Sequence, residues 1–389
     1  MSALLSSGWR DARRMLCVRL DSLGDVLMCT PAMRALRNAL PGRRLTLLAS
    51  PSGAAAAPFI PEIDDVIVHA APWIKDGAAS AADDAGPTQP CQADLALVET
   101  LAARAFDAAV IFTTYTQSAL PAALLCHLAG IPLRLAHCRE NPYRLLSDWM
   151  PDPEPARTVR HEVQRQLDLV KRIGCTPVDL GLSFVPRAAD HPAAVACLRG
   201  AGVDPDRPWV LLHPGASAAS RRYPTGHWAE VVKLLKASTA LPLVLGGGTA
   251  EIALVDEIRQ RCGVPTHSLA GRLGLGELGA ALRLAAVAVT NNSGPAHIAA
   301  AVGTPLVDLY ALTNPQHTPW GTRSRVLFHD VPCRFCFKSV CPEGHQACLA
   351  GVAPQRVVDA VTSLLGRPAP PACSPVAGLA EPTYTADDG

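Results

Sequence analysis

The sequence lacks a large excess of charge of either sign. It contains 35 basic and 34 acidic residues, which gives a net charge of +1. A chain with this balance has no global positive field to attract nucleic acid. We therefore expect no nucleic-acid partner, and a charged ligand has to be bound by a local cluster of side chains.

Long apolar segments are also missing. No stretch of about 18 uncharged apolar residues occurs, so the sequence predicts no membrane-spanning helix. The N-terminal stretch MSALLSSGWRDARRMLCVRL has too short an apolar core for a secretion signal. We therefore expect a cytoplasmic protein in which most of the 13 cysteines are reduced thiols.

What the chain does contain is enough apolar sequence for two cores. Apolar residues make up 49% of its 389 residues, and domains average about 100–200 residues. The interpretation is a first domain at 1–175, an interdomain connection at 176–207 and a second domain at 208–366. Composition further predicts a mobile surface loop at 76–92 and a disordered tail at 367–389.

Strand-like and helix-like runs alternate in both domains, which is typical of parallel βαβ units. In the first domain we expect strands at 15–20, 44–50, 64–70 and 106–114. The predicted fold class is α/β, with two doubly wound, Rossmann-like domains. Because open parallel sheets bind ligands at the carboxyl ends of their strands, a central cleft between the domains is expected.

The segment VTNNSGPAHIAAAVGTP joins a strand to a helix. Ser293 suits a helix N-cap, Pro295 the first helical position and Gly303 the far end. Capping explains these three residues but not Gly294 or a histidine, His297, in the first turn. Free amides at a helix N-terminus beside a glycine bind anions, so the segment predicts a diphosphate site.

Two other loops of the second domain follow strands. Ser217 ends the loop HPGAS and offers a hydroxyl donor. The adjacent Arg221 and Arg222 are either solvated surface residues or forked, charge-assisted ligands of a phosphate. In LGGGTAE, Gly247 lets the backbone approach a ligand closely, and Glu251 can accept hydrogen bonds from ribose hydroxyls.

The first predicted strand ends in RLDSLGDVL, which places Asp21 and Asp25 on one short turn. Asp25 is either a carboxylate favoured by the dipole of a helix N-terminus or a base in the cleft, and the spacing leaves both open. Further along, Thr30 and Pro31 suggest either a helix that begins at Pro31 or a short turn ahead of the main helix.

Together these segments resemble glycosyltransferase family 9, the ADP-heptose:lipopolysaccharide heptosyltransferases. The matching pieces occur in the family's order and span most of residues 15–320: RLDSLGDVLMCTPAMRALRNALP, HPGAS with RRYPTGHWAEVVKLL, LGGGTAE, and LAGRLGLGELGAALRLAAVAVTNNSGPAHIAAAVGTPLVDLYALTNP. The resemblance implies a GT-B fold, with the acceptor on the first domain and the nucleotide sugar on the second. It also implies inverting transfer with no cofactor or metal for catalysis.

The resemblance also implies roles for residues. Asp25 falls on the aspartate of the family's GD motif, the base for the acceptor hydroxyl, and Arg221 or Arg222 would hold the diphosphate. Tyr223 replaces the tryptophan of the family's WP motif, and Asn292 replaces the aspartate that usually begins the family's DSGxxH loop. Ser293, Gly294 and His297 complete that loop.

The implied function is transfer of heptose from ADP-heptose to a sugar hydroxyl of a phosphorylated, lipid-linked lipopolysaccharide core or a related glycan. The enzyme would act peripherally at the inner face of the cytoplasmic membrane. Three alternatives stay open: transfer to a protein serine, as in autotransporter heptosyltransferases, a non-catalytic nucleotide-sugar binder, and a nucleotide-sugar 2-epimerase. The segment 134–172 carries eight basic and six acidic residues, which form either a solvated surface or a phosphate site.

Four cysteines gather in the loop CRFCFKSVCPEGHQAC, at 333–348, with the spacing C-x2-C-x4-C-x6-C. Such a spacing predicts a structural zinc or iron site, and His345 could replace one thiolate. Some relatives with a cysteine-rich loop bind iron. The alternative is a reduced or disulfide-bonded loop. The predicted metal ligands are Cys333, Cys336, Cys341 and Cys348.

Overall fold

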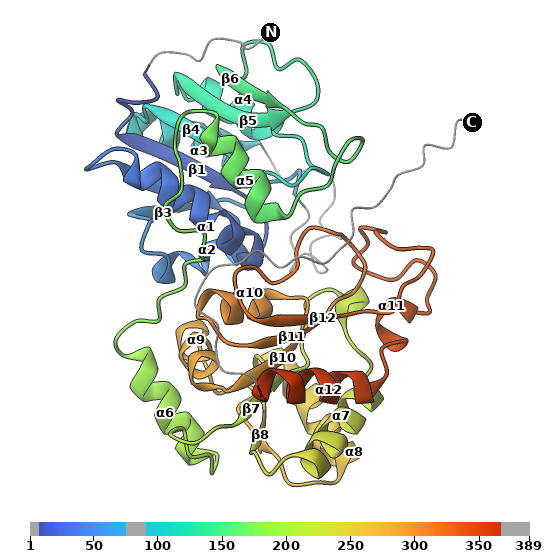
Figure 1. The fold of residues 1–389 in the computed structure, drawn as a ribbon. Helices are drawn as coiled ribbons and strands as arrows, with labels where there is room; N and C mark the ends of the chain where they lie inside the picture. The colour runs from blue at the N-terminus through green and yellow to red at the C-terminus, as the bar shows by residue number, and fades with distance from the viewer. Residues whose placement is uncertain (1–7, 75–90, 367–389) are drawn as a thin grey trace. The chain divides into compact units, whose positions relative to one another are not determined.

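The structure, a computed structural model, describes residues 8–74 and 91–366 (Figure 1). Most of the predicted loop at 76–92 and all of the predicted tail at 367–389 lie outside these residues. The chain divides into two compact units, unit 1 up to Leu180 and unit 2 from Gly181. No helix of the described residues is long and apolar enough to cross a membrane.

Unit 1 is built on a parallel sheet of six strands in the order β3-β2-β1-β4-β5-β6. All four strands expected from the sequence are present, although β3 and β4 are shorter than expected. The strands are β1 (Arg14–Arg19), β2 (Arg44–Ala49), β3 (Asp65–Val68), β4 (Ala108–Ile111), β5 (Leu133–Cys138) and β6 (Asp148–Pro151). The helices are α1 (Leu23–Asn38), α2 (Pro51–Ala54), α3 (Gln92–Arg104), α4 (Leu120–Leu128) and α5 (Glu162–Lys171).

Strand β5, with the sequence LRLAHC, was not among the expected strands, and it carries a charged residue, Arg134. The Arg134 side chain is nonetheless buried, since its guanidinium donates to the backbone carbonyls of Leu145 at 2.7 Å and Arg144 at 2.8 Å. The guanidinium therefore satisfies backbone carbonyls of the loop that follows β5. Sequence patterning cannot show this use of a buried charge.

Helix α1 begins at Leu23, well before the expected start at Thr30 and Pro31, so that expectation was wrong. Pro31 lies inside the helix. A proline there has no amide to donate to the carbonyl of Leu27, but the Thr30 hydroxyl donates to that carbonyl at 2.7 Å. This substitute hydrogen bond lets the helix continue, and it places Asp25 in the first helical turn.

Unit 2 repeats the architecture with six parallel strands in the order β12-β11-β10-β7-β8-β9, so the expected pair of doubly wound sheets is confirmed. The strands are β7 (Val210–His213), β8 (Leu243–Leu245), β9 (His267–Ser268), β10 (Val287–Asn291), β11 (Leu306–Leu309) and β12 (Ser324–Leu327). The helices are α6 (Asp190–Gly200), α7 (Thr225–Ser238), α8 (Ile252–Cys262), α9 (Leu275–Leu284), α10 (Gly294–Ala301), α11 (Ala347–Ala350) and α12 (Pro354–Leu365).

The predicted connection at 176–207 is not a simple linker. It contains helix α6, which packs against α9 and belongs to unit 2. Ahead of α6, the Phe184 ring packs on α9 at Gly279, where a Cβ would lie 2.3 Å from the ring. The proline- and glycine-rich composition of this stretch concealed a helix of 11 residues.

All strands of each sheet are parallel, so the loops after them leave from one edge of the sheet. In unit 1 this edge carries Asp21 and Asp25 after β1. In unit 2 it carries Ser217 after β7, Glu251 after β8 and Ser293 after β10. The sequence-predicted residues of each unit therefore gather at the carboxyl edge of that unit's own sheet.

Candidate functional site

In unit 1, Asp25 is held in place by hydrogen bonds at the start of α1. Its Oδ2 accepts from the Ser22 backbone amide at 3.2 Å and from Ser22 Oγ at 2.7 Å. Its Oδ1 lies 3.2 Å from Arg19 Nη2, and 15% of the side chain is exposed. A carboxylate that is fixed in orientation and still reaches solvent can receive a proton from a bound hydroxyl.

Arg19, the last residue of β1, is the buried centre of this site. Its Nε lies 2.8 Å from Asp21 Oδ2, and its Nη1 lies 2.6 Å from Glu162 Oε1 at the start of α5. Burial alone would lower the pKa of Arg19, but the charges of Asp21 and Glu162 outweigh it and raise the pKa. Sequence analysis missed Arg19 and Glu162. An arginine ending an otherwise apolar strand was the available signal for the first, and nothing marked the second.

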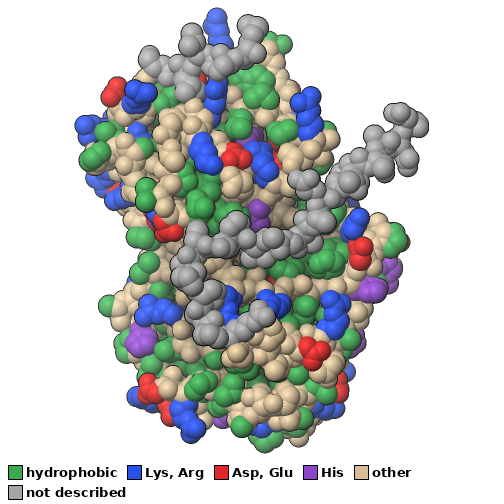
Figure 2. Space-filling model, viewed as in Figure 1, with side chains coloured by type: hydrophobic (Ala, Val, Ile, Leu, Met, Phe, Trp, Pro, Cys, Tyr) green, Lys and Arg blue, Asp and Glu red, His purple; other side chains and the backbone are tan. Residues whose placement is uncertain are grey.

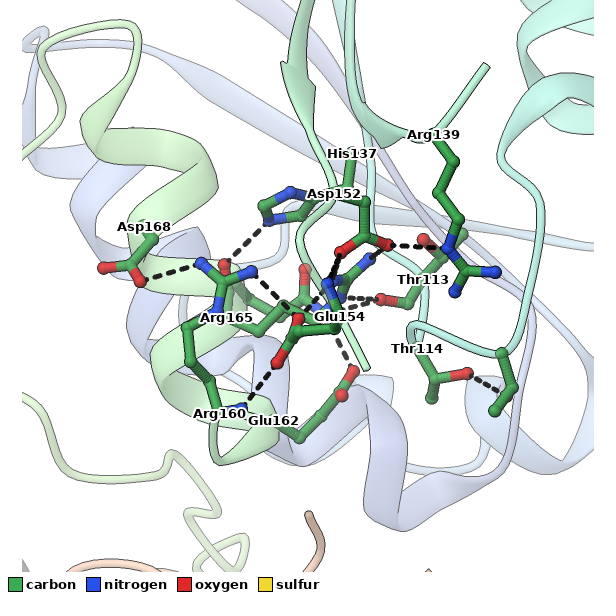
Figure 3. A network of polar contacts seen from close by, with 12 residues as sticks. Thr113, Thr114, His137, Arg139, Asp152, Glu154, Arg160, Glu162, Arg165 and Asp168 are labelled. Atoms are coloured by element: carbon green, nitrogen blue, oxygen red, sulfur yellow. Dashed lines mark hydrogen bonds and ion pairs between the residues drawn. The ribbon is translucent and has the colours of Figure 1, made fainter. Parts of the chain in front are cut away.

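A second network of buried charges fixes α5, the helix that carries Glu162 (Figure 3). Arg165 forms a two-pronged ion pair with Asp152, at 2.7 and 3.0 Å, and also contacts Glu154. Glu154 in turn pairs with Arg160 at 2.9 Å. Because α5 also packs against α1, this network supports the position of Glu162 beside Arg19.

The same network restricts which arginines of 134–172 can meet a phosphate. Arg134 and Arg165 are buried, and Arg160 is paired with Glu154 and Asp168. Arg139 is 47% exposed and lies 3.8 Å from Asp152. The predicted phosphate site therefore has fewer available arginines than the sequence suggested. Figure 2 shows basic and acidic side chains interspersed on the visible face of the described residues.

In unit 2, the Ser293 loop forms the N-terminus of α10 as predicted, but Ser293 does not cap it with its side chain. The hydroxyl instead donates to the carbonyls of Asn291 at 3.2 Å and Gly215 at 3.5 Å. Pro295 has no amide hydrogen, and the Ala296 amide donates to the Ser293 carbonyl. The amides left for a diphosphate at this end are those of Ser293 and Gly294, while His297 is buried in the helix.

Arg221 and Arg222 have different environments, although the sequence treated them alike. Arg222 donates from Nε to the Ala216 carbonyl at 2.8 Å and from Nη2 to the Ser217 carbonyl at 3.5 Å, so it shapes the loop after β7. The half-buried Arg221 side chain forms no hydrogen bond or ion pair with the described residues. Of the two, Arg221 is the guanidinium available to a ligand.

Glu251 lies against the loop after β7. Its Oε2 accepts from the Gly248 amide at 2.7 Å and lies 3.9 Å from His213 Nε2. A Cβ added to Gly215 would lie 1.5 Å from Glu251 Oε1, so a larger residue there would displace the Glu251 carboxylate. Gly247 likewise packs against the Glu251 side chain, with a hypothetical Cβ only 3.0 Å from Glu251 Cβ. Because Gly215 and Gly247 have no side chains, the Glu251 side chain can lie against both of them.

Two buried residues of this site, Asn291 and Asp308, were not identified from the sequence. Asn291 donates to the Pro214 carbonyl at 2.6 Å and accepts from the Tyr223 amide at 3.1 Å, which joins two loops. Asp308 of β11 is fully buried, and neither carboxylate oxygen has a hydrogen-bond partner among the described residues. Burial raises the pKa of Asp308, and the charge of Arg221 partly opposes this. Asn292 is itself buried.

The cysteine-rich loop packs against the Arg221 segment within unit 2. The Ser220 amide and hydroxyl donate to the carbonyls of Ser339 at 2.9 Å and Lys338 at 2.8 Å. Gln346 donates to the Ala219 carbonyl at 2.7 Å. The loop at 333–348 therefore helps to position the turn that carries Arg221, a role that sequence analysis did not foresee.

The predicted metal ligands surround a cavity of about 20 Å³, but they do not form a metal site. Cys333, Cys336, Cys341, Cys348 and His345 all line it. No group of three or more His, Cys, Asp or Glu side chains in the described residues is arranged to hold a metal ion. Cys333 Sγ and His345 Nε2 lie 4.0 Å apart. The metal prediction is therefore not supported.

A family model, glycosyltransferase family 9 (heptosyltransferase), matches residues 95–347. The chain is 29% identical over 160 residues to lipooligosaccharide heptosyltransferase 2 of Campylobacter jejuni, covering 40% of this chain and 50% of that protein. The matched part thus spans half the length of that relative. Asp25 lies outside the residues that the family model matches, so its role depends on the geometry of unit 1.

Solved structures share the fold along most of the chain. The family 9 glycosyl transferase from Veillonella parvula has a TM-score of 0.71 at 20% identity and covers 91% of this chain and 97% of its own. The Escherichia coli ADP-heptose LPS heptosyltransferase II has a TM-score of 0.66 at 23% identity, with coverage of 90% and 98%. At these identities the likeness shows the fold, which is the expected GT-B arrangement of two Rossmann-like units.

Proposed function

The chain belongs to glycosyltransferase family 9, and on that premise we propose that it is an inverting heptosyltransferase. It would transfer heptose from ADP-heptose to a sugar hydroxyl of the lipopolysaccharide core or a related glycan. The names of the relatives support this donor and acceptor, and the enzyme would act on a lipid-linked acceptor from the cytoplasmic side of the membrane. No resident cofactor is part of the proposal.

Unit 2 would bind the ADP moiety. Arg221 has a guanidinium without a protein partner in the described residues, and the Ser293 and Gly294 amides lie at a helix N-terminus. Both are suited to a diphosphate. They would stabilise the negative charge that develops on the leaving ADP. Glu251 is partly exposed beside the glycine loop and would accept from a ribose hydroxyl.

Unit 1 would activate the acceptor through Asp25. The carboxylate takes the proton of the acceptor hydroxyl as that oxygen forms a bond to the anomeric carbon. The bond between this carbon and the diphosphate oxygen breaks, and ADP leaves with the electron pair. Because one displacement occurs at the anomeric carbon, its configuration inverts.

The observation that carries this proposal is the geometry of Asp25. Ser22 and Arg19 fix its carboxylate at the carboxyl end of β1, and 15% of the side chain remains exposed. A purely structural helix cap would need the Ser22 contacts alone. The buried guanidinium provides a second fixed contact, as expected for a group whose orientation matters to a reaction.

The proposal is tested by ADP release. The full-length protein should release ADP from ADP-heptose when offered heptose-deficient lipopolysaccharide core, and ADP should raise its melting temperature more than UDP or GDP does. Transfer onto a protein serine instead of a glycan would favour the alternative of protein glycosylation. A clear preference for UDP would contradict the proposal and favour an epimerase or another transferase, and ADP binding without release in any assay would indicate a nucleotide-sugar binder.

A further inference from the structure

One buried guanidinium in unit 1 serves three carboxylates. Arg19 lies 2.8 Å from Asp21, 3.2 Å from Asp25 and 2.6 Å from Glu162, and its side chain has no exposed surface. If all three carboxylates were ionised, the cluster would carry two uncompensated negative charges. Since such charges are costly away from water, the protonation of one member must affect the others.

Burial raises the pKa of two members, Asp21 and Glu162, and of these two only Asp21, with 14% of its side chain exposed, can exchange a proton with solvent. Burial raises the pKa of Asp21 to about 6; Arg19 lowers it, Asp25 and Glu162 raise it, and a hydrogen bond from Gln117 lowers it. Helix α2 approaches the Asp21 backbone, where a Cβ on Gly53 would lie 2.8 Å from the Asp21 carbonyl oxygen. The titratable and charged groups around Asp21 are Arg19 of β1, Asp25 and Cys29 of α1, and Glu162 of α5.

We propose that Asp21 is a positioning residue that controls Asp25 through Arg19: turnover requires Asp21 to be ionised. This inference rests on the proposed function, in which Asp25 takes the acceptor proton. The geometry supplies the reason. Arg19 Nε lies 2.8 Å from Asp21 Oδ2 and Arg19 Nη2 lies 3.2 Å from Asp25 Oδ1, so the two carboxylates compete for the same positive charge.

The two protonation states of Asp21 give Asp25 different basicities. With a proton on Asp21, the charge of Arg19 is shared by Asp25 and Glu162 alone, which stabilises the Asp25 carboxylate and weakens it as a base. When Asp21 releases the proton to solvent, it takes a share of the Arg19 charge and adds a negative charge nearby. Asp25 then accepts the acceptor proton more readily, and it later returns that proton to solvent.

The test is the pH dependence of kcat for ADP release, with ADP-heptose and heptose-deficient lipopolysaccharide core as substrates. Wild-type kcat should rise about tenfold between pH 5 and pH 7, with a midpoint near the pKa of Asp21, about 6. Asp21→Asn should lose this rise and stay about tenfold below wild type at pH 7.5, with unchanged affinity for ADP. Asp21→Glu should restore the rise. An Asp21→Asn variant that keeps the midpoint, or loses the same factor at every pH, would overturn the inference.

A second measurement does not depend on turnover. The pKa of Asp21 is raised in the folded protein, so its ionisation costs stability as the pH increases through about 6. The melting temperature of Asp21→Asn relative to wild type should therefore increase from pH 5 to pH 8, and a constant difference would overturn the inference. Failure of the proposed function looks different: Asp25→Asn would then turn over within about twofold of wild type, whatever Asp21 does.

Discussion

The two units share one fold but treat buried charge at the carboxyl edge of their sheets in opposite ways. In unit 1, Arg19 and Arg165 are fully buried, and each forms ion pairs with carboxylates on other elements. In unit 2, Asp308 is as deeply buried, and neither of its oxygens has a partner among the described residues. Its nearest compensating charge is Arg221, which itself forms no ion pair there.

This difference shows whether the buried charges of each unit are neutralised by residues of that unit or left for a ligand. Unit 1 pairs its buried arginines with its own carboxylates, so the orientation of Asp25 is set before any ligand binds. Unit 2 leaves a guanidinium and a carboxylate without direct partners, so the charge of a bound diphosphate can be met by Arg221. Under the proposed function, the acceptor side would therefore be preorganised, whereas the donor side would be completed by its ligand.

The largest expected effect breaks the internal balance of unit 1. Arg165→Met leaves Asp152 and Glu154 buried without their main cation and should cost about 3–5 kcal/mol of the free energy of unfolding. The matched control is Arg139→Met, which removes a 47% exposed arginine 3.8 Å from the same Asp152 and should cost about 1 kcal/mol or less. Urea unfolding measures both. Equal losses would show that burial does not distinguish the two pairs.

The next effect concerns the preorganised carboxylate itself. Asp25→Asn keeps the shape of the side chain but cannot accept a proton, so turnover should fall roughly 100-fold or more while ADP affinity stays nearly intact. Steady-state ADP release and calorimetric ADP titration give the two readings. Asp11→Asn, an exposed aspartate of the same unit, is the control and should match wild type. Normal turnover in Asp25→Asn would contradict the assignment of Asp25 as the base.

A third prediction separates the neighbouring arginines of unit 2. Arg221→Ala should weaken ADP binding by about 1.5–3 kcal/mol, the value of a charge-assisted hydrogen bond, without lowering the melting temperature. Arg222→Ala should lower the melting temperature, because it removes the bond to the Ala216 carbonyl. Calorimetry and thermal melting are compared for both variants. The donor assignment is contradicted if Arg221→Ala binds ADP as wild type does.

The smallest effect contrasts two buried aspartates through pH. Although burial opposes it, Arg165 lowers the pKa of Asp152, so Asp152 contributes stability above its unfolded pKa of 3.8 and loses it as the pH falls further. Burial raises the pKa of Asp308, so stability is lost as the pH rises above 3.8 towards the higher folded value.

Asp152→Asn should therefore destabilise most near neutral pH, and this difference should shrink below about pH 4. Asp308→Asn should gain in melting temperature relative to wild type between pH 4 and pH 8. Thermal melts of both variants across this range provide the measurement. If the melting temperatures of the two variants changed with pH in the same way relative to wild type, the predicted difference between Asp152 and Asp308 would be wrong.

The sequence by itself determined the fold class and the family. Apolar runs alternating with helical periodicity repeat twice, and buried parallel strands need no partner information to be recognised. Short motifs also placed Asp25, Ser293 and Arg221 in loops after strands, because each motif and its flanking strand are contiguous in the chain. Helix α6 and strand β5 were missed because their prolines, glycines and charged residues suggested exposed loops.

Only the tertiary structure decided which charges meet. Glu162 reaches Arg19 across 143 positions of sequence, and Asp308 and Arg221 come from different elements of unit 2. The tertiary structure also distinguished the environments of Arg221 and Arg222. In the described residues, the four cysteines with metal-like spacing are not arranged to hold a metal ion. Ion pairs and ligand sites depend on distances of a few ångströms between side chains from different elements, and spacing along the chain does not specify those distances.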